Sequence, residues 1–121
     1  MISATTSRVH DRVSELRGAG FDAAGVAGDL TDAGAASGLA SAALDRWGRL
    51  DLVVNNAGMI SAAVPAFESG TITSMDLPTW QAALARNLTT AFLVTKAALP
   101  AMSRRRWGRI IMVASVTGPV M

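Results

Sequence analysis

The sequence predicts an α/β fold in which a parallel sheet carries helices on both faces. Short apolar runs alternate with segments of helical periodicity along all 121 residues, and a helical segment separates each pair of neighbouring runs. The runs lack the polar alternation of a strand that faces water on one side, which is typical of parallel strands covered on both faces. Because 50% of the residues are hydrophobic and 17% are charged, residues 1–121 are expected to form one domain with a buried core.

The first two predicted elements are a strand and a helix. Residues 2–5 resemble the end of a strand, and Ser7 is expected to cap the helix that follows. Gly18 and Gly20 are expected to end that helix. Its apolar residues recur at helical spacing and comprise Val9, Val13 and Leu16.

A second strand and helix follow. Residues 23–27 are small and compatible with a strand that stops at Gly28-Asp29. Either Thr31 or Asp32 is expected to cap the next helix, which should end at Gly48. The inner face of this helix is expected to comprise Ala36, Leu39, Ala40, Ala43 and Trp47.

The last two predicted strands enclose a long helix. The segment from Leu50 to Val54 is apolar apart from Asp51, and it is expected to be a buried strand that ends at Asn55-Asn56-Ala57-Gly58. A loop from Met59 to Met75 leads to a helix expected from Pro78 to about Met102. Gly108 is expected to break this helix before a final strand from Arg109 to Ala114. One face of the helix carries Trp80, Leu84, Leu88 and Ala91.

Composition excludes several classes of function. The chain has no cysteine, which excludes disulfides, thiolate metal sites and cysteine nucleophiles and fits a reducing, cytoplasmic compartment. No apolar run approaches the roughly 20 residues that span a bilayer, and the first residues do not resemble a signal peptide. The net charge of +2 does not indicate a nucleic-acid partner. Arg104-Arg105-Arg106 is expected to complement a helix dipole, since a phosphate-binding patch would need more basic residues on the same face.

Small polar residues follow each predicted strand. In open parallel sheets, ligands bind beyond the carboxyl ends of the strands. Each set of residues at these ends could form an ordinary turn by itself, but the four sets together indicate a nucleotide cleft. The sets are Ala4-Thr5-Thr6, Asp29-Leu30, Asn55-Asn56-Ala57-Gly58 and Ser115-Val116-Thr117-Gly118.

Asn87 is a second indication of function. It lies on the apolar face of the long helix, where asparagine is a poor helix former and where a buried amide needs hydrogen-bond partners. The spacing is equally compatible with a packing role, in which the backbone or a kink in the helix satisfies the amide.

Together these motifs resemble the short-chain dehydrogenase/reductase family over essentially the whole chain. The resemblance implies a Rossmann-like fold and an oxidoreductase that uses NADP or NAD to interconvert a small-molecule carbonyl and a secondary alcohol by hydride transfer. The motifs that carry it are Asp29-Leu30, Asn55-Asn56-Ala57-Gly58 after an apolar strand, Asn87-Leu88 in the long helix, and Gly108-Arg109-Ile110-Ile111 leading to Ser115.

The resemblance implies a cofactor-binding role for each matching residue at the strand ends. Asp29 would accept a hydrogen bond from the adenine amino group, with the Leu30 backbone nearby. Asn55 would brace the sheet beside the cofactor. Ala57 and Gly58 would let their backbone approach the adenosine ribose.

The resemblance also implies two catalytic positions and a cofactor preference. Asn87 would hold a proton-relay water, and Ser115 would hydrogen-bond the substrate carbonyl or hydroxyl. NAD-dependent members tend to carry an acid near Thr5, where this sequence has none, and Arg8 could meet a 2′-phosphate instead. These residues favour NADP over NAD, although Arg8 could also be a solvated residue of the first helical turn.

Two signatures of the family are absent, so the resemblance implies an incomplete domain. The glycine-rich turn and the first strand are missing because the sequence opens at the second strand. The chain has no tyrosine, so it lacks the Tyr-x-x-x-Lys acid/base pair that the family places beyond Ser115, together with the C-terminal part. We therefore expect no catalysis by these 121 residues alone.

The missing first strand also predicts a gap in the sheet. In the strand order 3-2-1-4-5-6, the first strand lies between the second and the fourth. The strands at Ile2 and Leu50 should therefore flank an empty position and expose unpaired edges. The isolated chain is expected to be marginally stable, to aggregate, or to close the gap in another way.

Two other interpretations stay open: a catalytically inactive nucleotide-binding or interaction module, and a fragment without autonomous function. The helix from Pro78 to Met102 resembles the subunit-packing helix of the family, which predicts a homodimer or homotetramer for the complete protein. No metal, nucleic acid or membrane is expected as a partner.

Overall fold

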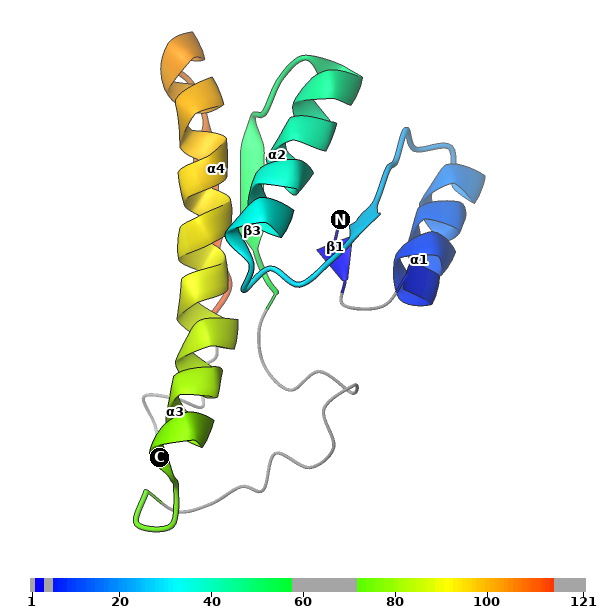
Figure 1. Ribbon diagram of the computed structural model, residues 1–121. Coiled ribbons are helices and arrows are strands. Elements are labelled where there is room, and N and C mark those ends of the chain that lie inside the picture. The colour runs from blue at the N-terminus through cyan, green and yellow to red at the C-terminus, as the bar shows by residue number, and fades with distance from the viewer. Residues whose placement is uncertain (1, 4–5, 58–71, 115–121) are drawn as a thin grey trace.

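The computed structural model describes residues 2–3, 6–57 and 72–114. Strands and helices alternate along the chain, as the sequence predicts (Figure 1). The elements are β1 (Ile2–Ser3), α1 (Thr6–Gly18), β2 (Val26–Ala27), α2 (Ala33–Trp47), β3 (Leu52–Asn55), α3 (Leu77–Leu84), a π-helical segment (Ala85–Thr89), α4 (Thr90–Arg105) and β4 (Arg109–Met112).

The strands form two parallel pairs. β1 pairs with β2, and β3 pairs with β4 with Val53 opposite Ile110. Among the described residues, β1 and β3 are not hydrogen-bonded to each other, so the two pairs remain separate sheets. Figure 1 shows that β1 and β3 point in the same direction. This arrangement is the interrupted parallel sheet that the sequence predicts.

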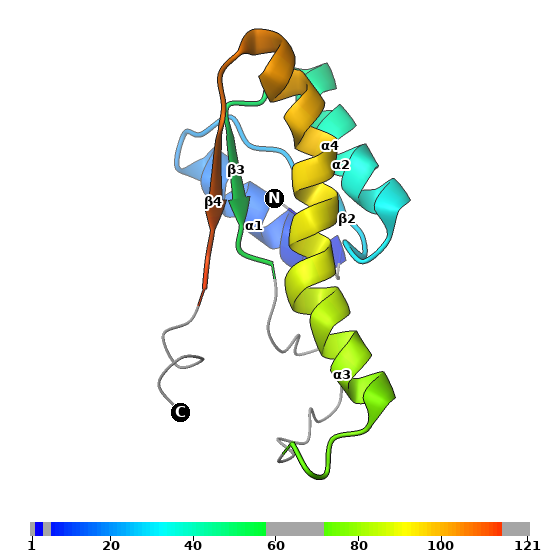
Figure 2. The same cartoon turned by 90° about the vertical axis from the view of Figure 1, so that its left-hand side faces the viewer.

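The helices divide between the two strand pairs. α1 contacts β1 and β2, whereas α2 and α4 pack against each other and α4 lies against β3. Figures 1 and 2 show α2 and α4 on the same side of β3 and β4. The core beneath α4 joins Val53, Ala98 and Met102 to the partly buried Leu50, Val94 and Ile110.

The prediction that β3 is buried on both faces is wrong for the described residues. Val53 and Asn55 are buried under α4, but Leu52 and Val54 are each 51% exposed. Side chains alternate between the two faces of a strand, and α4 covers only one of them. Ile111, which is opposite Val54 in the register, is also exposed, so the uncovered face is continuous across both strands.

Aspartates cap two of the helices. The Asp32 carboxylate accepts a hydrogen bond from the Ala35 N–H at 2.8 Å, which confirms Asp32 as the cap of α2. Gly48 ends that helix with φ of 68°, also as predicted. Asp76 caps α3 by accepting from the Thr79 N–H at 2.9 Å. The prediction for Ser7 is wrong, because α1 begins at Thr6 and Ser7 lies inside it.

The prediction that Gly108 breaks the long helix is also wrong. α4 continues to Arg105 and ends at Arg106, which adopts φ of 52°. Gly108 permits a close approach instead. A Cβ atom there would lie 2.5 Å from Met102 Sδ and 2.8 Å from Met102 Cβ. The absence of a side chain lets the backbone pass Met102 and enter β4.

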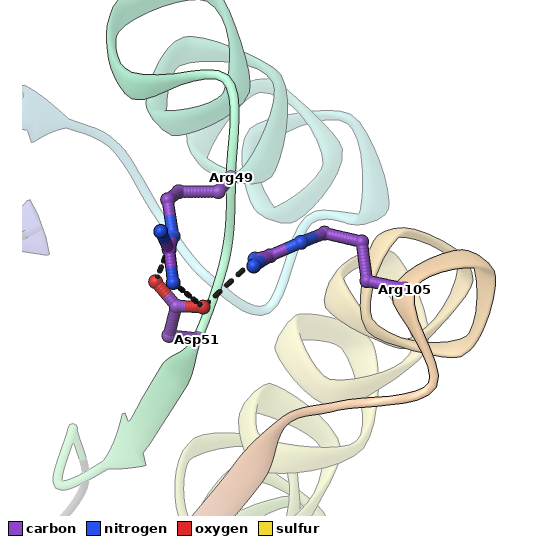
Figure 3. A network of polar contacts seen from close by, with 3 residues as sticks. All are labelled: Arg49, Asp51 and Arg105. Carbon is purple, nitrogen blue, oxygen red and sulfur yellow. Dashed lines mark hydrogen bonds and ion pairs between the residues drawn. The ribbon is translucent and has the colours of Figure 1, made fainter.

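Asp51 joins the start of β3 to the end of α4 (Figure 3). Its carboxylate accepts from Arg49 at 2.6 and 2.9 Å and from Arg105 at 2.8 Å. The hydrogen bonds from Arg49, followed by the one from Arg105, lower the pKa of the Asp51 carboxyl to about 2. Arg105 therefore has a specific partner in addition to its position in the last turn of α4.

Asp22 forms a similar link, between the segment before β2 and the end of α2. It precedes β2, and its carboxylate accepts from Arg46 and from Trp47 Nε1, the latter at 2.7 Å. Trp47 was predicted on the inner face of α2, but it is exposed at the end of that helix. Its ring lies under the Arg46 guanidinium, 5.3 Å from the ring centre, and its indole N–H holds Asp22.

Candidate functional site

The candidate site lies at the carboxyl ends of the strands. Arg8 is in the first turn after β1, Asp29 follows β2, and Asn56 and Ala57 follow β3. The π-helical segment directly precedes α4, the helix that packs on β3. Of the predicted site residues, Thr5, Gly58 and Ser115 lie outside the described residues, as does most of the loop from Met59 to Met75.

Asp29 and Leu30 form the turn between β2 and α2. Asp29 Oδ1 accepts from the Thr31 N–H at 2.9 Å and from the Thr31 hydroxyl at 2.8 Å. These bonds, the backbone one first, lower the pKa of the Asp29 carboxyl, so it is ionised at neutral pH. Leu30 is buried and anchors the turn, while Asp29 is exposed. The turn thus presents an acceptor on a fixed backbone.

Among the predicted polar site residues that the structure describes, Asn55 is the most buried, with 9% exposure. Its amide Nδ2 donates to Thr95 Oγ1 on α4 at 3.0 Å and contacts Met112 Sδ on β4 at 3.3 Å. The side chain therefore links β3, β4 and α4 at the point where β3 ends. Thr95 was not identified from the sequence, because nothing in the local pattern relates it to a residue so distant in the chain.

The chain is exposed immediately after Asn55. Asn56 and Ala57 are both exposed, and the Asn56 N–H turns back to the Val54 carbonyl at 3.1 Å. Arg8 is also exposed, on the first turn of α1. These residues are accessible to a ligand at the strand ends, in contrast to the buried Asn55.

Asn87 lies at the centre of the π-helical segment and is exposed, so its predicted burial is wrong. Its Nδ2 donates to the Ala83 carbonyl at 2.9 Å. Nearby, the Thr90 hydroxyl donates to the Arg86 carbonyl at 2.7 Å. The wider turn of a π-helix displaces backbone carbonyls from their usual partners, and these side chains supply donors in their place. Single π turns inside α-helices are frequent at functional sites.

The apolar face predicted on the long helix is largely exposed. Leu88 is 65% exposed, and Trp80 and Leu84 are exposed on α3. Farther along α4 is an open groove of about 370 Å³. It is lined by Phe92, Thr95, Lys96, Leu99, Pro100 and Ser103.

Neither a metal site nor a membrane-spanning helix occurs in residues 2–3, 6–57 and 72–114. Within these ranges, no group of three or more histidine, cysteine or carboxylate side chains could hold a metal ion. The helices of the described ranges are all too short or too polar to cross a membrane.

Comparison with known proteins identifies the fold. The chain is 35% identical over 106 residues to a 3-oxoacyl-[acyl-carrier-protein] reductase of Synechocystis, covering 88% of this chain and 40% of that protein. An actinorhodin polyketide ketoreductase solved with NADPH superposes with a TM-score of 0.85 at 31% identity, covering 98% of this chain and 43% of the other. A metagenomic short-chain oxidoreductase in complex with NADP superposes with a TM-score of 0.82 at 30% identity, covering 97% of this chain and 50% of the other.

The chain therefore matches only part of each relative, and it spans 39 to 42% of the length of three curated relatives. The match is nevertheless continuous, because the family model for short chain dehydrogenases covers residues 1–121. The parallel strand pairs of this chain and the helices that cover them are part of the Rossmann-like fold of these relatives. The chain belongs to the short-chain dehydrogenase/reductase family of oxidoreductases.

Proposed function

We propose that this chain forms the adenosine side of the NAD(P) site in an oxidoreductase that interconverts a carbonyl and a secondary alcohol. The observation that supports this best is Asn55. Its buried amide fixes the end of β3 against α4, and the exposed Asn56-Ala57 backbone leaves the sheet at that point. Such an arrangement offers rigid, accessible backbone where a nucleotide would lie.

The residues at the strand ends fit the adenosine half of a dinucleotide. The ionised Asp29 can accept from the adenine amino group, and the buried Leu30 keeps the neighbouring backbone in place. Ala57 carries a small side chain that permits close approach to the ribose, a role we extend to Gly58. When bound, the nicotinamide group supplies the hydride chemistry.

Two further residues are proposed on the catalytic side. Asn87 lies at the centre of the π-helical segment, and we assign it to holding a proton-relay water. We assign Ser115 to the substrate carbonyl or hydroxyl, which it would orient by hydrogen bonding. The chain contains no tyrosine, so the general acid/base must come from elsewhere in a complete enzyme.

The proposal includes NADP as the preferred cofactor. Arg8 is exposed on the first turn after β1, close in sequence to Thr5, and no acidic residue occurs between them. A guanidinium recognises a phosphate by paired, charge-assisted hydrogen bonds, whereas an acid would be needed to accept from the free ribose hydroxyls of NAD.

We further propose a cytoplasmic homodimer or homotetramer for the complete protein. The exposed apolar residues of α3 and α4, with the groove around Phe92 and Leu99, form a surface that helix packing against a second subunit would bury. The small-molecule substrate would be a carbonyl compound or a secondary alcohol.

Titration with NADPH tests the cofactor site directly. The chain should bind NADPH, and Asp29→Ala should weaken binding about tenfold, the effect of losing one hydrogen bond to a charged group. Asp45→Ala is the matched control, because Asp45 is an exposed carboxylate in α2, outside the strand ends. Arg8→Ala should weaken binding of NADPH but not of NADH. Failure of the chain to bind either nucleotide would contradict the proposal.

The alternatives differ in what they predict for the same titration. An inactive nucleotide-binding module would bind NADPH, yet a longer protein that contains residues 1–121 would reduce no carbonyl substrate. A fragment without function would neither bind NADPH nor gain stability from it. Circular dichroism of each variant distinguishes loss of binding from loss of folding.

A further inference from the structure

Thr95 brings a polar group into an otherwise apolar face of α4. Thr95, Ala98 and Met102 recur at helical spacing, so they lie on the face of α4 that packs on β3. Ala98 and Met102 are buried against Val53 in the core. Thr95 is half-buried and lies one turn closer to the start of the helix, where it meets Asn55, the other buried residue of β3. A polar pair thus occupies the end of an apolar interface.

Stability alone does not require this polar pair. A buried polar side chain must keep its hydrogen-bond partners, whereas two apolar side chains of the same shape in its place can be neutral or stabilising. The Asn55 Nδ2 donates to Thr95 Oγ1 at 3.0 Å and contacts Met112 Sδ at 3.3 Å. These contacts provide something that apolar packing would not, which is a defined orientation of the Asn55 amide.

Met112 determines which end of the amide faces α4 and β4. A thioether sulfur is a weak acceptor and cannot donate, so it pairs with the NH2 group of the amide and not with the carbonyl oxygen. If the amide were turned over, Oδ1 would lie against Met112 Sδ, with two acceptors in contact. Since Nδ2 carries two protons, Met112 and the Thr95 hydroxyl provide one acceptor for each of them.

This orientation leaves Asn55 Oδ1 as an acceptor at the end of β3. No residue in the described part of the chain donates to Oδ1, although the side chain is only 9% exposed. Buried polar atoms in proteins nearly always have a hydrogen-bond partner. The dinucleotide assigned to this edge of the sheet carries ribose hydroxyls, which are donors, and the exposed Asn56-Ala57 backbone begins at the next residue.

We propose that Thr95 is a positioning residue of the cofactor site. Together with Met112, it holds the Asn55 amide so that Oδ1 accepts a hydrogen bond from a ribose hydroxyl of the bound dinucleotide. This inference rests on the cofactor site proposed above, and it adds a residue of α4 that acts through Asn55. Without the Thr95 hydroxyl, one Nδ2 proton loses its acceptor, and the amide is free to turn and present NH2 where the ribose needs an acceptor.

Thr95→Val tests the inference, because valine has a similar shape to threonine but no hydroxyl. This change should weaken binding of NADPH to the chain about fivefold, the effect of one neutral hydrogen bond. Thr95→Ser keeps the hydroxyl and should bind NADPH as tightly as wild type. Thr90→Val is the matched control. Thr90 is a buried threonine of the same helix whose hydroxyl donates to the Arg86 carbonyl, so its loss should lower stability and leave the Kd for NADPH unchanged.

NMR of the isotopically labelled wild-type chain tests the orientation of the amide even if Thr95→Val fails to fold. The Nδ2 protons of Asn55 should exchange slowly with solvent, and NADPH should shift the side-chain carbonyl carbon of Asn55 while these protons stay protected. A wild-type chain that binds no nucleotide would overturn the cofactor site and this inference together. NADPH binding that is unchanged in Thr95→Val, or that leaves the Asn55 carbonyl signal in place, would overturn the inference alone.

Discussion

Replacing Gly108 with alanine should destabilise the protein, although the same change usually stabilises a protein where the backbone is unstrained and the space is open. A Cβ at Gly108 would lie 2.5 Å from Met102 Sδ, 2.6 Å from its Cγ and 2.8 Å from its Cβ. The thioether can rotate away, but the Met102 Cβ is fixed by the backbone of α4. Met102 is also buried in the core with Val53 and Ala98, so little free space is available for it to move.

The expected magnitude follows from two opposing effects. Inserting a methyl group into a packed core typically costs about 1–3 kcal/mol. Against this, replacing glycine restricts the unfolded chain and stabilises the native state by about 0.4–1 kcal/mol. The net loss for Gly108→Ala should be about 1–2 kcal/mol in the free energy of unfolding.

Urea unfolding followed by far-UV circular dichroism measures this loss as a lower midpoint with an unchanged slope. Gly38→Ala is the matched control, because Gly38 lies in α2 and an added Cβ would meet no atom within 4 Å, so alanine there should stabilise by up to about 1 kcal/mol. Combining Gly108→Ala with Met102→Ala removes the contacts with Sδ and Cγ but keeps the one with Cβ, so the double variant should cost somewhat less than the sum of the two changes. A Gly108→Ala protein as stable as wild type would refute the steric argument.

Three further predictions address the ion pairs, the helix caps and the chemistry. Because the pKa of Asp51 falls from 3.8 to about 2 in the folded state, its contribution to stability is present above pH 3.8 and disappears as the pH falls toward 2. The difference in unfolding free energy between wild type and Asp51→Asn should shrink over that interval, and a constant difference would contradict it. Asp32→Ala should cost about 1 kcal/mol by removing the α2 cap, with Asp45→Ala near neutral in the same thermal melt. The 121-residue chain should show no carbonyl-dependent oxidation of NADPH, and turnover at any measurable rate would show that an acid/base other than tyrosine operates.

The sequence was sufficient for features governed by neighbouring residues. The Asp32 cap and the Gly48 stop depend on local backbone geometry and were predicted correctly. The prediction for Gly108 was wrong because it relied on the same kind of local pattern. A glycine after a helix is usually a stop signal, and only the position of Met102 shows that this one serves a close contact.

Features that join distant segments could not be predicted in this way. The bond from Asn55 to Thr95 and the link from Asp51 to Arg105 depend on how α4 lies against β3. The exposure of Leu52 and Val54 depends on which face α4 covers, which hydrophobic character alone does not reveal. The π-helical segment could not be predicted, because helical periodicity assumes a constant number of residues per turn. The position of Asn87 on the apolar face nevertheless marked the region as unusual.

The π-helical segment also sets the rotational phase of the helix on either side of it. Each residue of an α-helix advances the side-chain direction by about 100°. The extra residue in the wide turn from Ala85 to Thr89 therefore offsets α3 from α4 by roughly that angle compared with an unbroken helix. Deleting one residue there would rotate Trp80 and Leu84 about the axis while the core contacts of α4 remained in place. The number of residues in this single turn, independently of the core, determines which way α3 faces.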